Sequence, residues 1–257
     1  MRLFLASLLL LAPLAGHAAD RCAFEAPRNL DVDLAGVRGV QIQVRSFDLH
    51  VTGRADARAL NVRGRACASD RETLEGLTIT QHREGDQLIV ELGGDEHMSF
   101  HLFGNHESDL DVTVQLPANL PLTVDVGSGD ADVAGVQQLT SHVGSGDLHV
   151  RNISGAFATG VGSGDIEAND VGSLEVGAVG SGDLTVSRIG GDARVGSVGS
   201  GDVRLREARG SVHVDTLGSG DVDIDGVGAD LHVGAKGSGD VSYRNVKGKV
   251  QVPSDDD

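Results

Sequence analysis

Apolar and polar side chains alternate along much of the first half of this chain. The alternation is clearest in six short segments, at 29–34, 40–44, 49–51, 77–80, 88–92 and 110–114. A period of two residues is typical of β-strands with one buried face. Beyond the first twenty residues, no stretch keeps its apolar residues at the 3.6-residue spacing of an amphipathic helix. We therefore expect strands and almost no helix.

From about Leu116 the alternation is organised into a repeat. The tetrapeptide Gly-Ser-Gly-Asp occurs seven times, starting at positions 127, 144, 162, 180, 199, 218 and 237. Each unit reads as two short strands separated by glycine-containing bends. The predicted inward residues of one unit are Leu184, Val186, Ile189, Ala193, Val195 and Val198, and those of the next are Val203, Leu205, Ala208, Val212, Val214 and Leu217. Units this small must stack to bury these residues, with bend glycines that adopt positive φ and let backbones approach closely.

The repeat predicts an all-β fold, a single-chain right-handed parallel β-helix with about 18–19 residues per turn. An antiparallel meander is the alternative, but it would not bring the Gly-Ser-Gly-Asp segments into one row. The expected organisation is a signal peptide at 1–18, an irregular β part at 19–116 that extends or caps the solenoid, the repeat β-helix at 117–252 and an acidic tail at 253–257.

The first residues predict export. Arg2 precedes an apolar run from Leu3 to Leu14, and small residues follow up to Ala18. The run is too short to span a membrane, and no second run of that kind follows, so we expect no transmembrane segment in the mature chain. The expected location is the periplasm, the cell surface or the medium. In such an oxidising compartment Cys22 and Cys67 are expected to form a disulfide, with a redox or metal role as the alternative.

The net charge of the chain restricts the classes of partner that it can bind. The formal net charge is −17, and loss of residues 1–18, which contain one arginine and no acidic residue, takes it to about −18. This sign argues against nucleic acid and against adsorption to an anionic membrane. It suits divalent cations or basic partners. The chain has no tryptophan and one tyrosine, which disfavours a groove that stacks on sugars.

Seven aspartates end the tetrapeptides and should form one row: Asp130, Asp147, Asp165, Asp183, Asp202, Asp221 and Asp240. We expect each carboxylate to accept backbone N–H groups of its own bend. We expect no cofactor, and the alternative is a ladder of calcium sites between adjacent turns. Calcium-binding β-rolls of secreted toxins place their aspartates in a different nonapeptide, used twice per turn, which this repeat does not match.

Other polar residues form weaker candidates. His97, His101 and His106 could ligate a transition metal, although their spacing matches no known template. Glu175, Arg194, His213 and His232 are predicted to point outward along one side and to offer a binding surface. Arg188, Arg204, Arg206 and Arg209 cluster near one turn. We find no catalytic motif, so we expect no enzyme, and a polysaccharide-active β-helix enzyme is the least favoured alternative.

One segment carries a family resemblance. Residues 108–133 include Leu-Pro-Ala-Asn-Leu-Pro shortly before the first Gly-Ser-Gly-Asp. This stretch and the repeats after it resemble the bacterial adhesin family of exported β-strand-repeat proteins, related to the head GIN domain. The resemblance covers roughly residues 30–252 and implies a β-helical, exported protein without catalytic residues. It also implies envelope-stress sensing as an alternative role.

Together these observations predict a non-enzymatic, exported module that is adhesin-like or associated with the envelope. Its partner would be a protein or another component of the envelope. The alternatives are a calcium-binding β-roll, a component of envelope-stress sensing and a polysaccharide-active enzyme.

Overall fold

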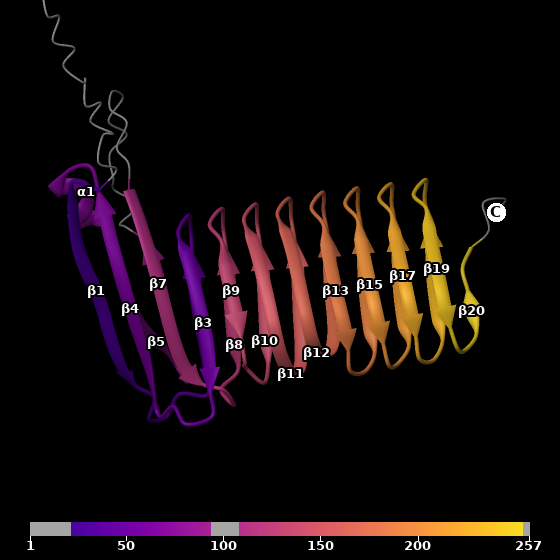
Figure 1. The fold of residues 1–257 in the computed structure, drawn as a ribbon, viewed down its shortest axis with the longest axis horizontal. Coiled ribbons are helices and arrows are strands. Elements are labelled where there is room, and N and C mark those ends of the chain that lie inside the picture. Colours follow the sequence, from indigo (N-terminus) through magenta and orange to yellow (C-terminus); the bar gives the residue numbers. More distant parts are fainter. Residues whose placement is uncertain (1–21, 94–107, 254–257) are drawn as a thin grey trace, which may run out of the picture.

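The computed structural model describes residues 22–93 and 108–253, and it is a β-solenoid (Figure 1). Each turn of the repeat contains two strands, such as β13 (Leu184–Ile189) and β14 (Ala193–Val198). β13 pairs in parallel with β15 (Val203–Ala208), and β14 pairs in parallel with β16 (Val212–Leu217). The predicted parallel stack is confirmed and the antiparallel meander is wrong for the repeat. The right-handed winding stays a prediction.

The strands form two faces that enclose one core. Face 1 holds the strands that follow the Gly-Ser-Gly-Asp bends, and face 2 holds those that precede them. Face 1 contains β3 (Asp48–Arg54), β7 (Ser108–Pro117), β9 (Ala131–Ala134), β13, β15, β17 (Val222–Val227) and β19 (Val241–Val246). Face 2 contains β2 (Gly39–Val44), β6 (Gln87–Gly93), β8 (Leu122–Val126), β10 (Leu139–Val143), β14, β16, β18 (Leu231–Lys236) and β20 (Val250–Gln251). The long strands β11 (Asp147–Val161) and β12 (Asp165–Val179) run through both faces.

The core consists of aliphatic rows that run along the solenoid. All twelve predicted inward residues of the two units from Leu184 to Leu217 are buried, none more than 5% exposed. They also pair in the predicted register, with Val186 opposite Leu205 and Val195 opposite Val214. One row also contains polar residues. Ser141 and Thr159 are buried in it, and their hydroxyl groups form a hydrogen bond of 2.7 Å.

The bend glycines serve close packing rather than unusual dihedral angles. None of the Gly-Ser-Gly-Asp glycines has a positive φ, so the prediction is wrong for these bends, although Gly135 and Gly226 do have positive φ angles of 75° and 82°. The second glycine of each tetrapeptide is buried, and the predicted close approach is confirmed. At Gly182, for example, a Cβ atom would overlap the carbonyl oxygen of Gly164 one turn below. Only glycine lets consecutive bends stack at this distance.

Positive φ angles occur instead in a row on face 1 that the sequence did not predict. Its members are Asn152, Asp170, Arg188, Glu207 and Asn245, with φ of 55° to 59°, and Gly226, with φ of 82°. Each lies just before an inward-pointing apolar residue, such as Ile189 after Arg188, and this residue is fully buried in every turn except the last, where Val246 is partly buried. The left-handed residue changes the alternation, so that the chain points inward again three residues after Val186 rather than two.

The N-terminal region begins with a turn that lacks the tetrapeptide. β2 lies between β6 and β8 on face 2, and β3 lies between β7 and β9 on face 1. In sequence order, the β2–β3 turn comes before β6 and β7, which stack on its N-terminal side. The regular repeat begins at β8 and β9, which stack on its other side.

Antiparallel strands and a short helix close this N-terminal end. On face 1, β4 (Ala59–Ala68) is antiparallel to β7, and β1 (Phe24–Asp33) is antiparallel to β4. On face 2, β5 (Thr78–Glu84) is antiparallel to β6. Between β4 and β5 lies α1 (Arg71–Gly76), whose first turn is capped by the Asp70 carboxylate, which accepts the Thr73 N–H at 2.8 Å.

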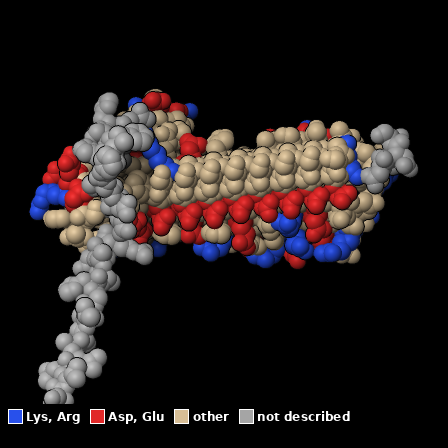
Figure 2. All heavy atoms as spheres, turned by 90° about the horizontal axis from the view of Figure 1, so that it is seen from above, with Lys and Arg blue, Asp and Glu red and all other residues tan. Residues whose placement is uncertain are grey.

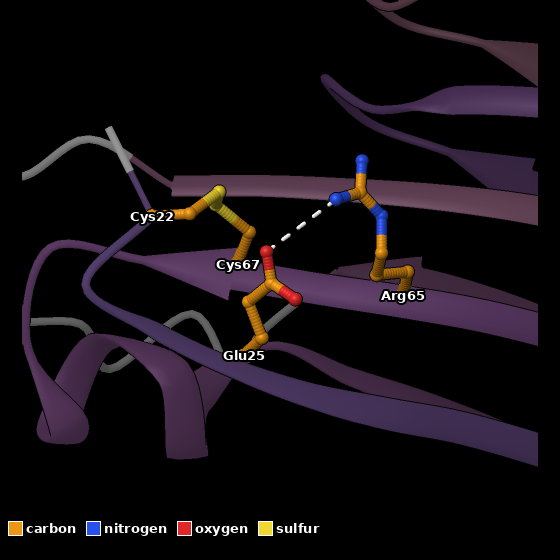
Figure 3. The surroundings of a disulfide bond; sticks show 4 residues. All are labelled: Cys22, Glu25, Arg65 and Cys67. Carbon is orange, nitrogen blue, oxygen red and sulfur yellow. Dashed lines mark ion pairs between the residues drawn. A yellow bond between two sulfur atoms is a disulfide. The ribbon is translucent and has the colours of Figure 1, made fainter. Parts of the chain in front are cut away.

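A disulfide ties this end together. Cys22 and Cys67 form it, as predicted, with Cα atoms 5.2 Å apart (Figure 3). It joins the start of β1 to the end of β4, which are already paired as strands. Glu25 and Arg65 add an ion pair of 3.5 Å between the same two strands.

Candidate interaction surfaces

The predicted aspartates do form one row, along the edge where face 2 passes into face 1. Figure 2 shows an unbroken line of acidic side chains beside a ridged surface of uncharged residues. From Asp130 to Asp221, each carboxylate Oδ1 accepts the backbone N–H of the aspartate one turn further on. The N–H groups of Asp147, Asp165, Asp183, Asp202, Asp221 and Asp240 lie 3.3, 3.3, 3.0, 3.1, 3.1 and 3.0 Å from the preceding carboxylate, beginning with that of Asp130.

This geometry corrects the expected turn. The carboxylate was expected to accept N–H groups of its own bend, but it bonds to the next turn instead. The reason is that the bend N–H groups already have carbonyl partners, as when Ser181 and Gly182 both donate to Gly162. The acidic row therefore links turns, and Arg204 offsets part of its charge by contacting Asp183 at 3.2 Å and Asp202 at 2.9 Å.

Asp48 stands in the same line as these aspartates, and sequence reasoning missed it. It pairs in register with Asp111, and the Leu49 N–H after it donates to the Asp130 carbonyl. Partial burial raises the pKa of Asp48, and the charges of Asp130, Asp109 and Asp111 raise it further. The signal was present, since Ser46 to Val51 reads Ser-Phe-Asp-Leu-His-Val and Ser145 to Val150 reads Ser-Gly-Asp-Leu-His-Val.

The metal predictions stay untested. Among the residues that the structure describes, no group of three or more His, Cys, Asp or Glu side chains is arranged to hold a metal ion. His97, His101 and His106 lie outside the described residues, as do the predicted signal peptide and residues 254–257 of the acidic tail.

The second predicted surface is assembled on face 2. Glu175, Arg194, His213 and His232 are opposite one another on successive strands, and we call them the face-2 row. The rings of His213 and His232 stack with centroids 4.6 Å apart. Asp215 accepts hydrogen bonds from Arg194 at 2.7 and 2.9 Å and lies 2.6 Å from His213 Nε2. The structure thus brings all four predicted residues together.

The arginine cluster is divided between two places. Arg204 and Arg206 point outward from β15 and contact aspartates of neighbouring turns. Arg188 and Arg209 line a shallow groove of about 680 Å³ on the edge opposite the acidic row, together with Asp170 and Glu207. Arg188 binds Asp170 through two hydrogen bonds of 2.6 and 2.7 Å, which lower the pKa of that carboxyl.

Comparison with solved structures places this fold among known proteins. A protein from Bacteroides fragilis described as a putative adhesin is 14% identical, with a TM-score of 0.57 over 87% of this chain and 99% of that chain. Two proteins from Parabacteroides distasonis are also similar. One is described as a putative adhesin (14% identity, TM-score 0.42, 89% and 97% coverage) and one as a putative lipid binding protein (13%, 0.46, 87% and 96%). The Bacteroides likeness shows a shared fold.

The remaining comparisons concern sequence and membrane association. No curated protein matches the chain. Within residues 22–93 and 108–253, no helix has the length and apolar character needed to cross a membrane. The family described as "Putative auto-transporter adhesin, head GIN domain" matches residues 68–247, well over half of the sequence, and the chain belongs to this family.

Proposed function

We propose that this protein is an exported, non-enzymatic interaction module that binds an envelope component through the face-2 row. The observation that carries the proposal is the row itself. The acidic row on the edge is explained by the backbone N–H groups that it accepts. The face-2 row has no such role, because its side chains point away from the core. Outward side chains of a stacked sheet do not serve the core. A comparable line of ionisable residues on face 1 is His50, Asp132, His149 and Glu167. The face-2 row differs by its two stacked imidazoles, whose ring centroids are 4.6 Å apart, and this feature favours it as the recognition surface.

The chemistry of the row suits a flat polar surface. Arg194 is 58% exposed and can donate to carboxylate or phosphate oxygens, although it already contacts Asp215. His213 and His232 present stacked imidazoles beside it. A flat interface of this kind gains affinity from several modest contacts in register rather than from one deep pocket.

Export is supported by three observations. The disulfide of Cys22 and Cys67 is typical of oxidising compartments. The first eighteen residues have the pattern of a secretory signal. The family description refers to adhesins, which act outside the cytoplasm.

The test is retention of isolated envelopes from the producing bacterium on beads coated with residues 19–257. The substituted protein carries Arg194→Ala, His213→Ala and His232→Ala. We expect it to lose most of the retention, because three adjacent polar contacts are removed from one line.

The matched control removes three outward side chains from face 1, His149→Ala, Arg151→Ala and Glu167→Ala. These residues also lie on neighbouring turns and are more exposed than His213, so their removal is the stricter control. The control should retain envelopes like the unsubstituted protein. Equal retention by both variants, or none by any protein, would refute the proposal.

A further inference from the structure

The C-terminal end of the solenoid is open. β19 pairs only with β17, and β20 pairs only with β18, within the described part of the chain. No further described turn packs on the inward-pointing residues of β19 and β20, so these residues are partly exposed to solvent. Tyr243 is 48% exposed and Val250 is 38% exposed, whereas their counterparts one turn earlier, Ile224 and Leu231, are each 1% exposed. Tyr243 and Val250 are the exposed large apolar residues among those described.

The exposed edge also carries free backbone groups. A strand paired on one side leaves alternate N–H and C=O groups unpaired on the other, and such an edge is a template for another strand. β19 offers six residues of this kind without a proline. Its apolar side chains Val241, Tyr243 and Val246 continue rows that are buried everywhere below. The exposed side of the β19–β20 turn therefore resembles the side of the β17–β18 turn on which β19 and β20 are stacked.

The opposite end is protected against strand addition. β1 contains Pro27 and charged residues, and β5 ends with His82, Arg83 and Glu84, all exposed. Proline and charge on an edge strand prevent pairing with other chains. The helix α1 and the disulfide lie at the same end. Among the described residues, the combination of an apolar surface with an accessible strand edge occurs at the C-terminal end.

Charge indicates which kind of strand would fit. All three lysines of this acidic chain lie near the open end, at positions 236, 247 and 249. Lys247 and Lys249 belong to the turn between β19 and β20, and neither is in an ion pair with another described residue. A second copy would bring the same cations into contact, which disfavours end-to-end dimers. An acidic segment would meet opposite charge at this bend, whereas the opposite edge of the last turn carries Asp240.

We propose that the open end binds one extended, acidic segment of a partner protein, which adds beside β19 and β20 as a further turn. Its apolar side chains cover Val241, Tyr243 and Val246, and its carboxylates lie near Lys247 and Lys249. The two surfaces meet at β20, where Gln251 lies 3.0 Å from the ring of His232, but the open end is defined by β19, Val250 and the lysines. The inference therefore does not depend on the function proposed above.

A peptide copied from residues 218–233 is a suitable probe. It contains four aspartates and forms the turn on which β19 and β20 stack, so its inward residues match the open end. We expect the labelled peptide to bind the full chain in a fluorescence anisotropy titration at low salt and to bind more weakly as salt is added. A control peptide with proline in place of Val222 and Ile224 should not bind, because it cannot pair as a strand.

Substitutions locate the site on the protein. Lys247→Glu with Lys249→Glu should weaken peptide binding by about tenfold or more, and Tyr243→Asp should abolish it. The matched control, Arg38→Glu with Arg58→Glu, makes the same charge change near the other end and should bind normally. Replacing Asp255, Asp256 and Asp257 with asparagine should strengthen binding, because these acids follow β20 in the sequence.

Two results would overturn the proposal. One is the absence of binding, or binding that none of the substitutions at the open end changes while the variants keep the circular dichroism spectrum of the unsubstituted chain. The other is a dimer in sedimentation velocity that Tyr243→Asp dissociates, since the occupant would then be a second copy rather than an acidic partner.

Discussion

At the scale of single residues, the close stacking of the repeat depends on glycines, which have no side chain to separate consecutive turns. The second glycine of each tetrapeptide is required by the backbone one turn below and not by its own dihedral angles. This distinction matters for substitutions, because a glycine with ordinary φ is tolerant of alanine wherever space allows. The stack contains glycines of both kinds, so their effects can be compared.

The first prediction concerns Gly182 and Gly177. Gly182→Ala should destabilise the protein by about 3 kcal/mol, because the new methyl group meets the Gly164 carbonyl and the two turns must separate. At Gly177 the nearest atom to a Cβ is the Thr159 carbonyl oxygen at 3.8 Å, so Gly177→Ala should change stability by less than about 1 kcal/mol. Urea unfolding followed by circular dichroism measures both, and equal losses would contradict this account.

The second prediction concerns the buried hydroxyl pair. Thr159→Val leaves the Ser141 hydroxyl without its partner, and Ser141→Ala does the same to Thr159, so each should cost about 1–3 kcal/mol. The double substitution leaves neither group unpaired, and the neighbouring residues of this row, Val124 and Val176, are apolar. It should be at least as stable as either single variant. Additive losses in a double-mutant cycle would show that the hydroxyl pair is not coupled.

At the scale of strands and turns, regular repetition made the sequence informative. The two-strand turn, its register and its inward residues follow from Gly-Ser-Gly-Asp and from the aliphatic positions after it. The β2–β3 turn was not recognised, because Arg45 and Phe47 stand where the tetrapeptide has glycine. Its insertion between β6–β7 and β8–β9 is a matter of long-range pairing, which local patterns do not encode. The left-handed row could have been found in part, because Asn, Asp and Gly, which favour positive φ, occupy four of its six positions. Arg188 and Glu207 have no such preference and hide the pattern in the middle of the row.

The acidic row gives the third prediction, at Asp48. Its folded-state pKa is raised from 3.8, so the ionised carboxylate is less favourable in the folded protein than in the unfolded chain. The stability that its protonated form provides is complete below about 3.8 and is lost as the pH rises through the folded-state pKa. Asp48→Asn should therefore stabilise the protein at pH 7. The gain should be less than about 1 kcal/mol, because the carboxylate is only partly covered and solvent screens the rest. The gain should vanish at pH 3.

Asp31 provides a control of opposite sign. Hydrogen bonds from Arg63 and Asn61 lower the pKa of its carboxyl, so the ionised form stabilises the folded protein above the unfolded pKa. Asp31→Asn should destabilise at pH 7, and the difference should disappear as the pH falls through the folded-state pKa. Thermal unfolding across this pH range compares the two variants. A loss of stability for Asp48→Asn at neutral pH would contradict the account of the acidic row.

At the scale of the whole molecule, the two ends of the solenoid have different chemistry. Each regular turn contacts mainly the turns on either side, so stability accumulates along the stack and fraying begins at the ends. The N-terminal end is closed by antiparallel strands, a helix and a disulfide, whereas the C-terminal end leaves an inward row exposed. We therefore expect local stability to vary along the solenoid axis and to be lowest at the open C-terminal end.

Removal of the disulfide tests this view of the molecule. Cys22 and Cys67 are 45 residues apart, and the chain-entropy model gives about 4 kcal/mol for closing a loop of that length. Cys22→Ala with Cys67→Ala should leave the β1–β4 ladder in place but let it open more often, and so increase hydrogen exchange in residues 24–68. Exchange in residues 184–233 should hardly change, because those turns touch only their neighbours. Uniform loss of protection along the chain would mean that the solenoid unfolds as one unit and that its ends are not independent.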